Sequence, residues 1–240
     1  MANFVLVHGS LGGAWVWQKV SRLLRSSGHE VYAPGLTGLS DRSHLLACGV
    51  DLTTHITDVA NVLFYEDLTS VVLVGHSYGG MVITGVAAKA PERLKLLVYL
   101  DAYVPAEGQS EADLWSAEMR AAREADAAAH GGLTQPPPPE ILGITDTEMA
   151  NWVKARWTPH PFATYTEAVT GGNARSAALP RAYIHCLGGP TTTTPGFAPF
   201  AAKARASGWK TRELATGHMA MLTAPREVAA LLHELATGLT

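Results

Sequence analysis

Short apolar runs alternate along the chain with longer segments of helical periodicity. The strand-like runs are residues 4–7, 30–34, 71–74, 94–100, 181–187 and 212–215. The helical pattern, with apolar residues three or four positions apart, covers residues 14–26, 51–66, 81–89, 197–207 and the stretch from Pro225 onward. Strands that alternate with helices predict an α/β protein with a parallel, doubly wound sheet. Ligands of such sheets bind beyond the carboxyl ends of the strands.

One long segment, residues 104–180, departs from this alternation. It contains an alanine-rich helical pattern at 111–129, an extended proline run at 136–139 and a helical pattern at 147–156. Because this segment shows no strand set of its own, we expect a cap over a pocket and not a second domain. The chain is therefore predicted to be one domain, 1–240, with its core at about 1–103 and 181–240 and a helical cap insert at about 104–180.

The composition suits a globular protein with a sizeable core, since 47% of the 240 residues are hydrophobic and 16% are charged. The formal net charge of -3, without a run of lysines or arginines, argues against nucleic acid or an acidic membrane as a partner. A small molecule is the expected ligand.

No apolar run reaches the roughly 18 residues of a membrane span, and the first residues show no signal-peptide pattern. A cytoplasmic protein is expected. Cys48 and Cys186, the two cysteines, are expected to be reduced. The oligomeric state is left open, with a homodimer as one possibility.

The most informative stretch is VVLVGHSYGG at residues 71–80. A buried strand ends at Gly75, Ser77 stands between Gly75 and Gly79 in a G-x-S-x-G pattern, and a helical run follows. This order of strand, sharp turn and helix is typical of the nucleophile elbow of α/β hydrolases. Glycines let the strand and helix backbones approach, while the serine occupies a strained turn with its hydroxyl exposed. Ser77 is therefore the predicted nucleophile; the alternative is a glycine-rich turn with an incidental serine.

A serine hydroxyl is a weak nucleophile, so it needs a histidine to take its proton. His218 follows the last predicted strand and comes after Ser77 in chain order, which is where an elbow hydrolase places its base. We expect His8 and His76 to be packed and hydrogen-bonded near the elbow. Four others, in helical or polar contexts, are expected at the surface: His29, His44, His130 and His233.

Stabilising the transition-state oxyanion requires two backbone amides. In an elbow hydrolase, one follows the nucleophile and the other belongs to the loop after an early strand. Tyr78 and Ser10 occupy these positions. The histidines show no metal-ligand spacing and the chain has no G-x-G-x-x-G pattern, so neither a metal nor another cofactor is expected.

With these motifs, the chain resembles the α/β-hydrolase superfamily, and within it the small esterases related to plant methylesterases and hydroxynitrile lyases. The resemblance covers nearly the whole chain through FVLVHGSLGGAW, VVLVGHSYGGM, LVYLDAYVP and GHMAMLTAP. In the lyase branch, a threonine follows the first histidine and a lysine follows the catalytic one. Because Gly9 and Met219 stand there in this chain, the resemblance implies an esterase and not cyanohydrin cleavage.

The acid of the triad departs from the pattern of the methylesterases, which carry it after the penultimate strand. Here Gly188 and Gly189 occupy that place, whereas Asp101 follows the strand next to the elbow, where some other α/β hydrolases place the acid. The resemblance thus implies a triad of Ser77, Asp101 and His218. The alternative is that Asp101 only stabilises a turn, and Asp41 is the second choice of acid.

The expected function is a serine carboxylesterase that hydrolyses a small or medium, largely apolar ester through an acyl-enzyme intermediate. Six residues are expected to line its substrate pocket: Gly9, Leu11, Trp115, Met119, Trp152 and Met219. A lactonase, a biosynthetic acyl-transfer or cyclising enzyme, and a small-ligand receptor on the same fold remain alternatives.

Overall fold

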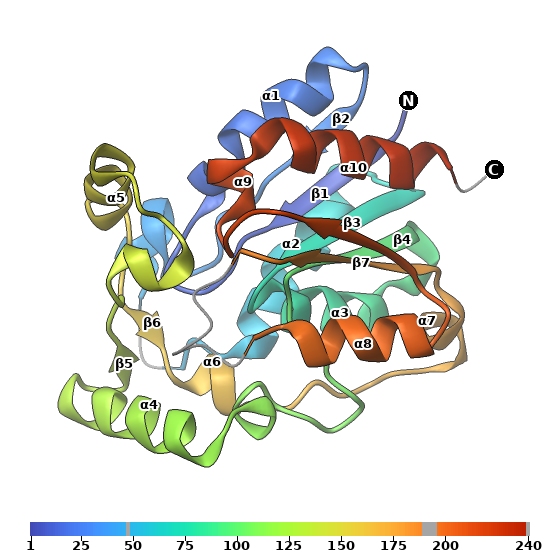
Figure 1. Ribbon diagram of the computed structural model, residues 1–240. Helices are drawn as coiled ribbons and strands as arrows, with labels where there is room; N and C mark the ends of the chain where they lie inside the picture. The colour runs from blue at the N-terminus through green and yellow to red at the C-terminus, as the bar shows by residue number, and fades with distance from the viewer. Residues whose placement is uncertain (47–48, 189–195, 239–240) are drawn as a thin grey trace.

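The computed structural model describes residues 1–46, 49–188 and 196–238. In this part of the chain, six strands form one parallel sheet in the order β2-β1-β3-β4-β7-β8 (Figure 1). Their bounds are β1 Asn3–Val7, β2 Glu30–Tyr32, β3 Val71–His76, β4 Leu94–Leu100, β7 Arg181–Cys186 and β8 Lys210–Leu214. The predicted α/β class with a doubly wound sheet is confirmed.

Helices cover both faces of the sheet, and the strand residues alternate between the two layers. Phe4 and Leu6 of β1 pack with α1 (Gln18–Ser26) and α10 (Pro225–Thr237) on one face. Val5 and Val7 pack on the other face, where α2 (Leu52–Tyr65), α3 (Gly79–Lys89) and α8 (Ala198–Ala206) lie (Figure 1). Both faces of β3 are therefore buried, which explains its continuous apolar sequence.

The helix boundaries follow local capping chemistry. Asp51 accepts a hydrogen bond from the Thr54 amide while Thr54 bonds back to the Asp51 amide, so α2 begins one residue later than predicted. Ser116 caps α4 (Ala117–Ala129), whereas the sequence predicted that this helix begins at residue 111. The prediction was wrong there because residues 112–114 form a separate 3-10 turn before that cap.

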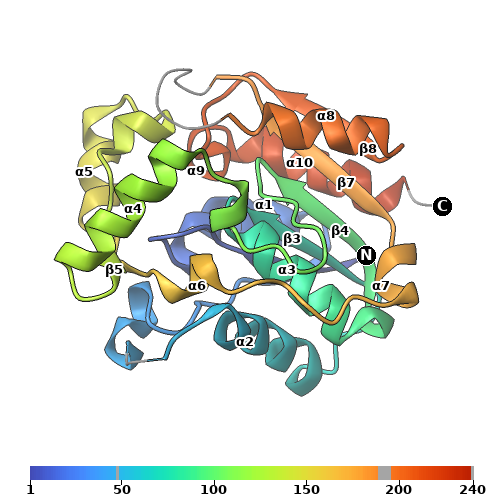
Figure 2. The same cartoon turned by 90° about the horizontal axis from the view of Figure 1, so that it is seen from below.

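The cap segment, residues 104–180, contributes α4, α5 (Thr147–Lys154), α6 (Ala163–Thr166) and α7 (Ala174–Ala178). Figure 2 shows α4, α5 and α6 gathered beside the sheet, with α7 apart from them. This segment also contains a short antiparallel pair, β5 (Leu133–Thr134) with β6 (His160–Pro161). The sequence did not predict this pair, since two-residue strands leave no periodic pattern.

Of the four histidines expected at the surface, three are exposed and one is buried. His44, His130 and His233 are exposed, but His29 is only 4% exposed. The His29 ring packs edge-on against Phe4, and its Nδ1 accepts a hydrogen bond from the Ala2 amide. A single histidine after a helix-ending glycine gave no indication of this packing.

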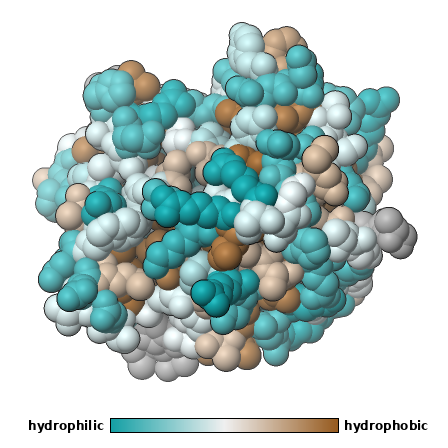
Figure 3. Space-filling model, turned by 90° about the horizontal axis from the view of Figure 1, so that it is seen from above, coloured by the Kyte–Doolittle hydropathy of each residue, from teal (hydrophilic) through white to brown (hydrophobic). Residues whose placement is uncertain are grey.

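The molecular face over α1 and α10 is mostly hydrophilic, with scattered apolar residues (Figure 3). Among the described residues, none of the helices has both the length and the apolar character needed to span a bilayer.

Cys186 is a buried thiol without a disulfide partner in the described chain. Cys48, also predicted to be reduced, and Gly189, which stands where the methylesterases carry their acid, lie outside the described residues.

Gly80 allows the start of α3 to contact the loop after β4. A Cβ atom at this position would lie 2.1 Å from the Tyr103 carbonyl oxygen, which is backbone and cannot rotate away. We expect Gly80→Ala to lower the free energy of unfolding by about 3 kcal/mol or more, since it forces a steric overlap in a packed core. Urea denaturation measures this, with Gly196→Ala as the control because no described atom lies within 4 Å of its Cβ position. Equal stability of the two variants would contradict the prediction.

Candidate active site

Ser77 lies in the turn between β3 and α3 with a left-handed backbone, at φ 55°. The flanking glycines make this turn possible. A Cβ on Gly75 would lie 2.5 Å from the Gly79 carbonyl oxygen, and one on Gly79 would lie 2.9 Å from the Val7 carbonyl oxygen. The strand, the helix and β1 thus approach too closely for any larger residue, and Ser77 occupies a conformation uncommon for non-glycine residues.

His218 and Asp101 come together from elements that are far apart in the chain. His218 Nδ1 lies 2.7 Å from Asp101 Oδ2, and since a carboxylate only accepts, the imidazole donates this bond. Asp101 directly follows β4 and is only 4% exposed. Its Oδ1 also accepts a hydrogen bond from the Cys186 amide at 3.2 Å. This arrangement leaves Nε2 of His218 as the basic nitrogen.

The predicted nucleophile and base share one cavity of about 80 Å³, which both Ser77 and His218 line. Within the described chain the Ser77 hydroxyl makes no hydrogen bond, including to His218. Nucleophile and base are often loosely aligned until a substrate binds. The His218 ring contacts two other rings: it stacks on Phe197, with ring centroids 4.9 Å apart, and its centroid lies 4.4 Å from that of His76.

The two predicted oxyanion donors remain available. Neither the Ser10 nor the Tyr78 backbone N–H donates a hydrogen bond to another group in the part of the chain that the structure describes. Ser10 lines the same cavity as Ser77, whereas Tyr78 does not line it and is fully buried. The Tyr78 hydroxyl donates to His55 Nδ1 at 2.8 Å, because His55 Nε2–H donates to the Thr37 carbonyl.

His8 and His76 are buried and hydrogen-bonded, as predicted. His8 Nδ1–H donates to the Gly9 carbonyl and its Nε2 accepts from the Leu36 amide, and burial lowers the pKa of His8 to about 4. His76 Nε2–H donates to the His218 carbonyl at 2.9 Å. Burial and the neighbouring imidazole hold the pKa of His76 well below its usual value. His76 therefore positions His218 without adding a positive charge beside it.

His160 connects the cap segment to the loop that carries Ser10. Its Nδ1 accepts a hydrogen bond from the Leu11 amide at 3.2 Å, and its Nε2–H donates to the Thr164 hydroxyl at 2.8 Å. Neither His160 nor His55 was predicted from the sequence. His55 shares the apolar face of α2 with Val59, which was an available signal. His160 stands between two prolines, and nothing in the pattern indicated its role.

Five of the six predicted pocket residues line the cavity: Gly9, Leu11, Trp115, Met119 and Met219. Trp152 does not, and this prediction was wrong. Its ring contacts Trp15 edge-on and lies under the Arg156 guanidinium, and it lines a separate hollow between α5 and the start of α1. Asp41, the second choice of acid, is exposed in the turn Ser40–Leu45, whereas the hydrogen bond to His218 belongs to Asp101.

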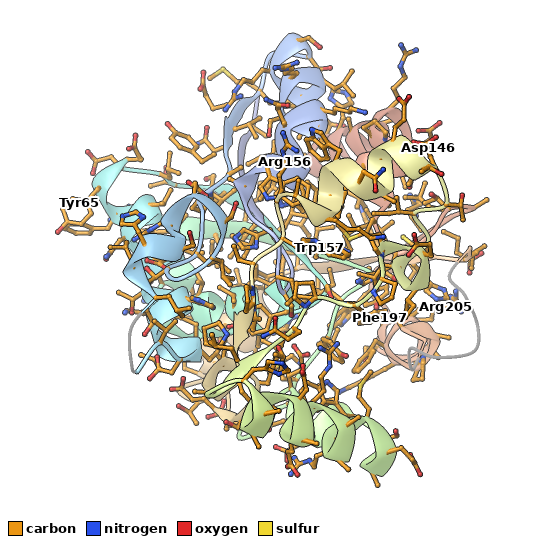
Figure 4. The ribbon with its side chains drawn as sticks, turned by 90° about the vertical axis from the view of Figure 1, so that its left-hand side faces the viewer. Tyr65, Asp146, Arg156, Trp157, Phe197 and Arg205 are labelled. Atoms are coloured by element: carbon orange, nitrogen blue, oxygen red, sulfur yellow. The ribbon has the colours of Figure 1, made fainter. Side chains whose placement is uncertain are left out.

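The cavity wall is mostly aromatic and aliphatic. Trp157 of the cap segment and Phe197 before α8, both labelled in Figure 4, contribute to it. A glutamate and an arginine, Glu111 and Arg123, also line it and were not predicted. Glu111 is only 3% exposed, and burial raises its pKa to about 8 although the Arg123 charge opposes this shift. The carboxyl group is therefore neutral at pH 7.

The raised pKa of Glu111 gives a testable pH dependence of stability. The folded protein keeps this proton up to about pH 8, whereas the unfolded chain releases it near the ordinary value of 4.5. The free energy of unfolding should therefore fall between these pH values, by an amount on the order of 4 kcal/mol for this group. Urea denaturation of wild type and Glu111→Gln at pH 5, 7 and 9 measures the difference. If the free energy of unfolding changed with pH by the same amount in wild type and in Glu111→Gln, the prediction would be wrong.

The fold, the elbow and the His218–Asp101 pair together define the class of α/β hydrolases. A family model described as the alpha/beta hydrolase family matches residues 4–231. The chain belongs to this family.

Individual relatives extend this finding. The chain is 39% identical to the carbendazim hydrolyzing esterase of Nocardioides sp. (strain SG-4G), over 98% of this chain and all of that protein. It is 41% identical to methylesterase 1 of Arabidopsis thaliana over 43% of this chain and 40% of that protein. A solved structure described as an extracellular alpha/beta-hydrolase from a Paenibacillus species superposes with a TM-score of 0.86, at 27% identity, covering 98% of this chain and 99% of that chain. The resemblance to small esterases that the motifs indicated is confirmed.

Proposed function

We propose that this protein is a serine-dependent carboxylic ester hydrolase that acts on a small or medium, largely apolar ester through an acyl-enzyme intermediate. One observation carries the proposal: His218, which donates a 2.7 Å hydrogen bond to Asp101, lines the same cavity as Ser77 with its left-handed backbone. The relatives named as esterases support the same reaction class.

In the first half of the reaction, Ser77 Oγ attacks the ester carbonyl carbon while His218 Nε2 takes the hydroxyl proton. Asp101 stabilises the resulting imidazolium through its hydrogen bond to Nδ1. The backbone amides of Ser10 and Tyr78 receive the oxyanion, and one such donor contributes roughly 10² to 10³ in rate. The alcohol leaves with the proton from His218, which forms the acyl-enzyme.

In the second half, water replaces the alcohol as nucleophile and His218 again acts as base. The acid product then leaves, and Ser77 regains its proton. The mostly apolar wall of the cavity suits an uncharged substrate. Gly9 and Met219 line this cavity where the lyase branch carries threonine and lysine, so no cation faces His218 from position 219 to receive cyanide.

The test is steady-state hydrolysis of a panel of p-nitrophenyl acyl esters, methyl esters, lactones and carbendazim. Methyl esters and carbendazim are included because the relatives are named for them. Wild type should hydrolyse at least one ester class with burst kinetics, and mass spectrometry should detect acylated Ser77. A lactone preference would indicate a lactonase. Two results together would favour a receptor and overturn the proposal. These are tight binding of a panel compound and a hydrolysis rate that is the same in wild type and in Ser77→Ala.

A further inference from the structure

Glu111 has an unusual environment for a carboxyl group. It is 3% exposed and lines the same cavity as Ser77. Its Oε1 accepts a hydrogen bond from Trp115 Nε1–H at 3.3 Å, whereas its Oε2 is buried without any hydrogen-bond partner among the described residues. A buried polar atom left unpaired is rare and costs stability, so it requires an explanation.

The chemistry of the unpaired atom indicates what would bind to it. At neutral pH, burial keeps Glu111 protonated because its pKa is raised to about 8. Since Oε1 already accepts from Trp115, the proton belongs on Oε2, which makes this atom an O–H donor directed at no protein group. Arg123, a second donor-only group, lines the same wall and makes no hydrogen bond or ion pair in the described chain. This part of the wall therefore presents donors without acceptors.

We propose that Glu111 is a specificity-determining residue that donates a hydrogen bond to an uncharged acceptor, a ring nitrogen or carbonyl oxygen, in the non-reacting part of the substrate. Arg123 faces the same group of the ligand. This inference rests on the proposed ester hydrolysis and narrows its substrate class to esters that carry a second acceptor remote from the scissile bond. A wholly apolar ester would leave the Glu111 donor buried and unpaired.

The experiment compares two esters that differ only in the acceptor: the pyridyl isomers of methyl 3-pyridylpropanoate against methyl 3-phenylpropanoate. In wild type at pH 6.5, kcat/KM should favour at least one pyridyl isomer by about 5- to 10-fold, the value of one hydrogen bond to a buried donor. Glu111→Met removes the donor and should bring the ratio to about 1. Glu111→Gln keeps an N–H donor and should retain most of the preference. Glu118→Met, an exposed position on α4, is the control and should leave the ratio unchanged.

The pH dependence of this ratio separates Glu111 from the catalytic groups. Ser77 and His218 act on the same ester group in both substrates, so their contribution cancels in the ratio. The other titratable groups that interact electrostatically with Glu111 are Arg123, Tyr78, Tyr103 and Tyr165, and burial raises the pKa of all three tyrosines, that of Tyr165 to about 12. The pyridyl preference of wild type should therefore decline above about pH 8, whereas that of Glu111→Gln should not.

Binding to the Ser77→Ala protein distinguishes this inference from the proposed function. Calorimetric titration should give a tighter Kd for the preferred pyridyl ester than for the phenyl ester, and Glu111→Met in the same background should abolish the difference. If wild type hydrolyses neither these two esters nor any compound of the panel above while this binding preference persists, the hydrolase proposal fails and the acceptor site stands. Equal Kd values, no measurable binding of either ester, or an unchanged ratio in Glu111→Met would overturn the inference even if hydrolysis proceeds.

Discussion

Replacing Ser77 by alanine is expected to lower kcat for ester hydrolysis by about 10⁵- to 10⁶-fold, because no other group at the elbow can form the acyl-enzyme. The substitution removes a single oxygen atom. Since the Ser77 hydroxyl makes no hydrogen bond in the described chain, its loss leaves no group unpaired. We expect the fold and the affinity for substrate to persist, and stopped-flow and steady-state assays on a p-nitrophenyl ester measure the change.

Combining the substitutions at Ser77 and His218 tests whether the two side chains act together. His218→Ala should lower kcat nearly as much as Ser77→Ala, and the double variant should be little worse than either, because nucleophile and base act as one unit. A fluorophosphonate probe should label wild type at Ser77 and label His218→Ala far more slowly. Additive losses, or labelling at another serine, would show that the two side chains do not cooperate in catalysis.

The core of the fold could be predicted because its periodicity is strong. Residues 94–100 were predicted as a strand and form β4 with the same first and last residues, because a short apolar run is typical of a strand buried on both faces. The cap segment was predicted less well. Its element boundaries depend on local hydrogen bonds, such as the cap from Ser116 and the two-residue strand pair at His160. Such hydrogen bonds leave no pattern of hydrophobicity in the sequence.

The candidate site divides in the same way. Ser77 and His218 could be found because a motif and a strand end mark them. Glu111 could not, because its importance arises from burial that only the packed cap creates around an ordinary glutamate. Trp152 was placed in the pocket on residue type alone, whereas in the structure it packs against Trp15 and lines a different hollow, between α5 and α1. Residue type indicates what a side chain can do, whereas tertiary packing decides which cavity it faces.

Asp101→Asn is expected to lower kcat by about 10⁴-fold while leaving the fold intact. The carboxylate requires His218 to keep its proton on Nδ1, whereas a carboxamide can donate to that nitrogen and favour the tautomer whose Nε2 is protonated and cannot act as base. Asparagine suits the position sterically. It tolerates the left-handed backbone of Asp101, at φ 43°, and its oxygen can still accept from the Cys186 amide.

The measurement is kcat for an activated ester in wild type and Asp101→Asn, with Asp41→Asn as the matched control and circular dichroism to establish folding. Asp41 is exposed and bonds to neither Ser77 nor His218, so its variant should keep activity within about twofold, the range usual for surface changes. A folded Asp101→Asn protein with near wild-type kcat would mean that the 2.7 Å bond to His218 only orients a turn. Because the base would then lack a charged partner, the acid would have to be sought among other residues near His218.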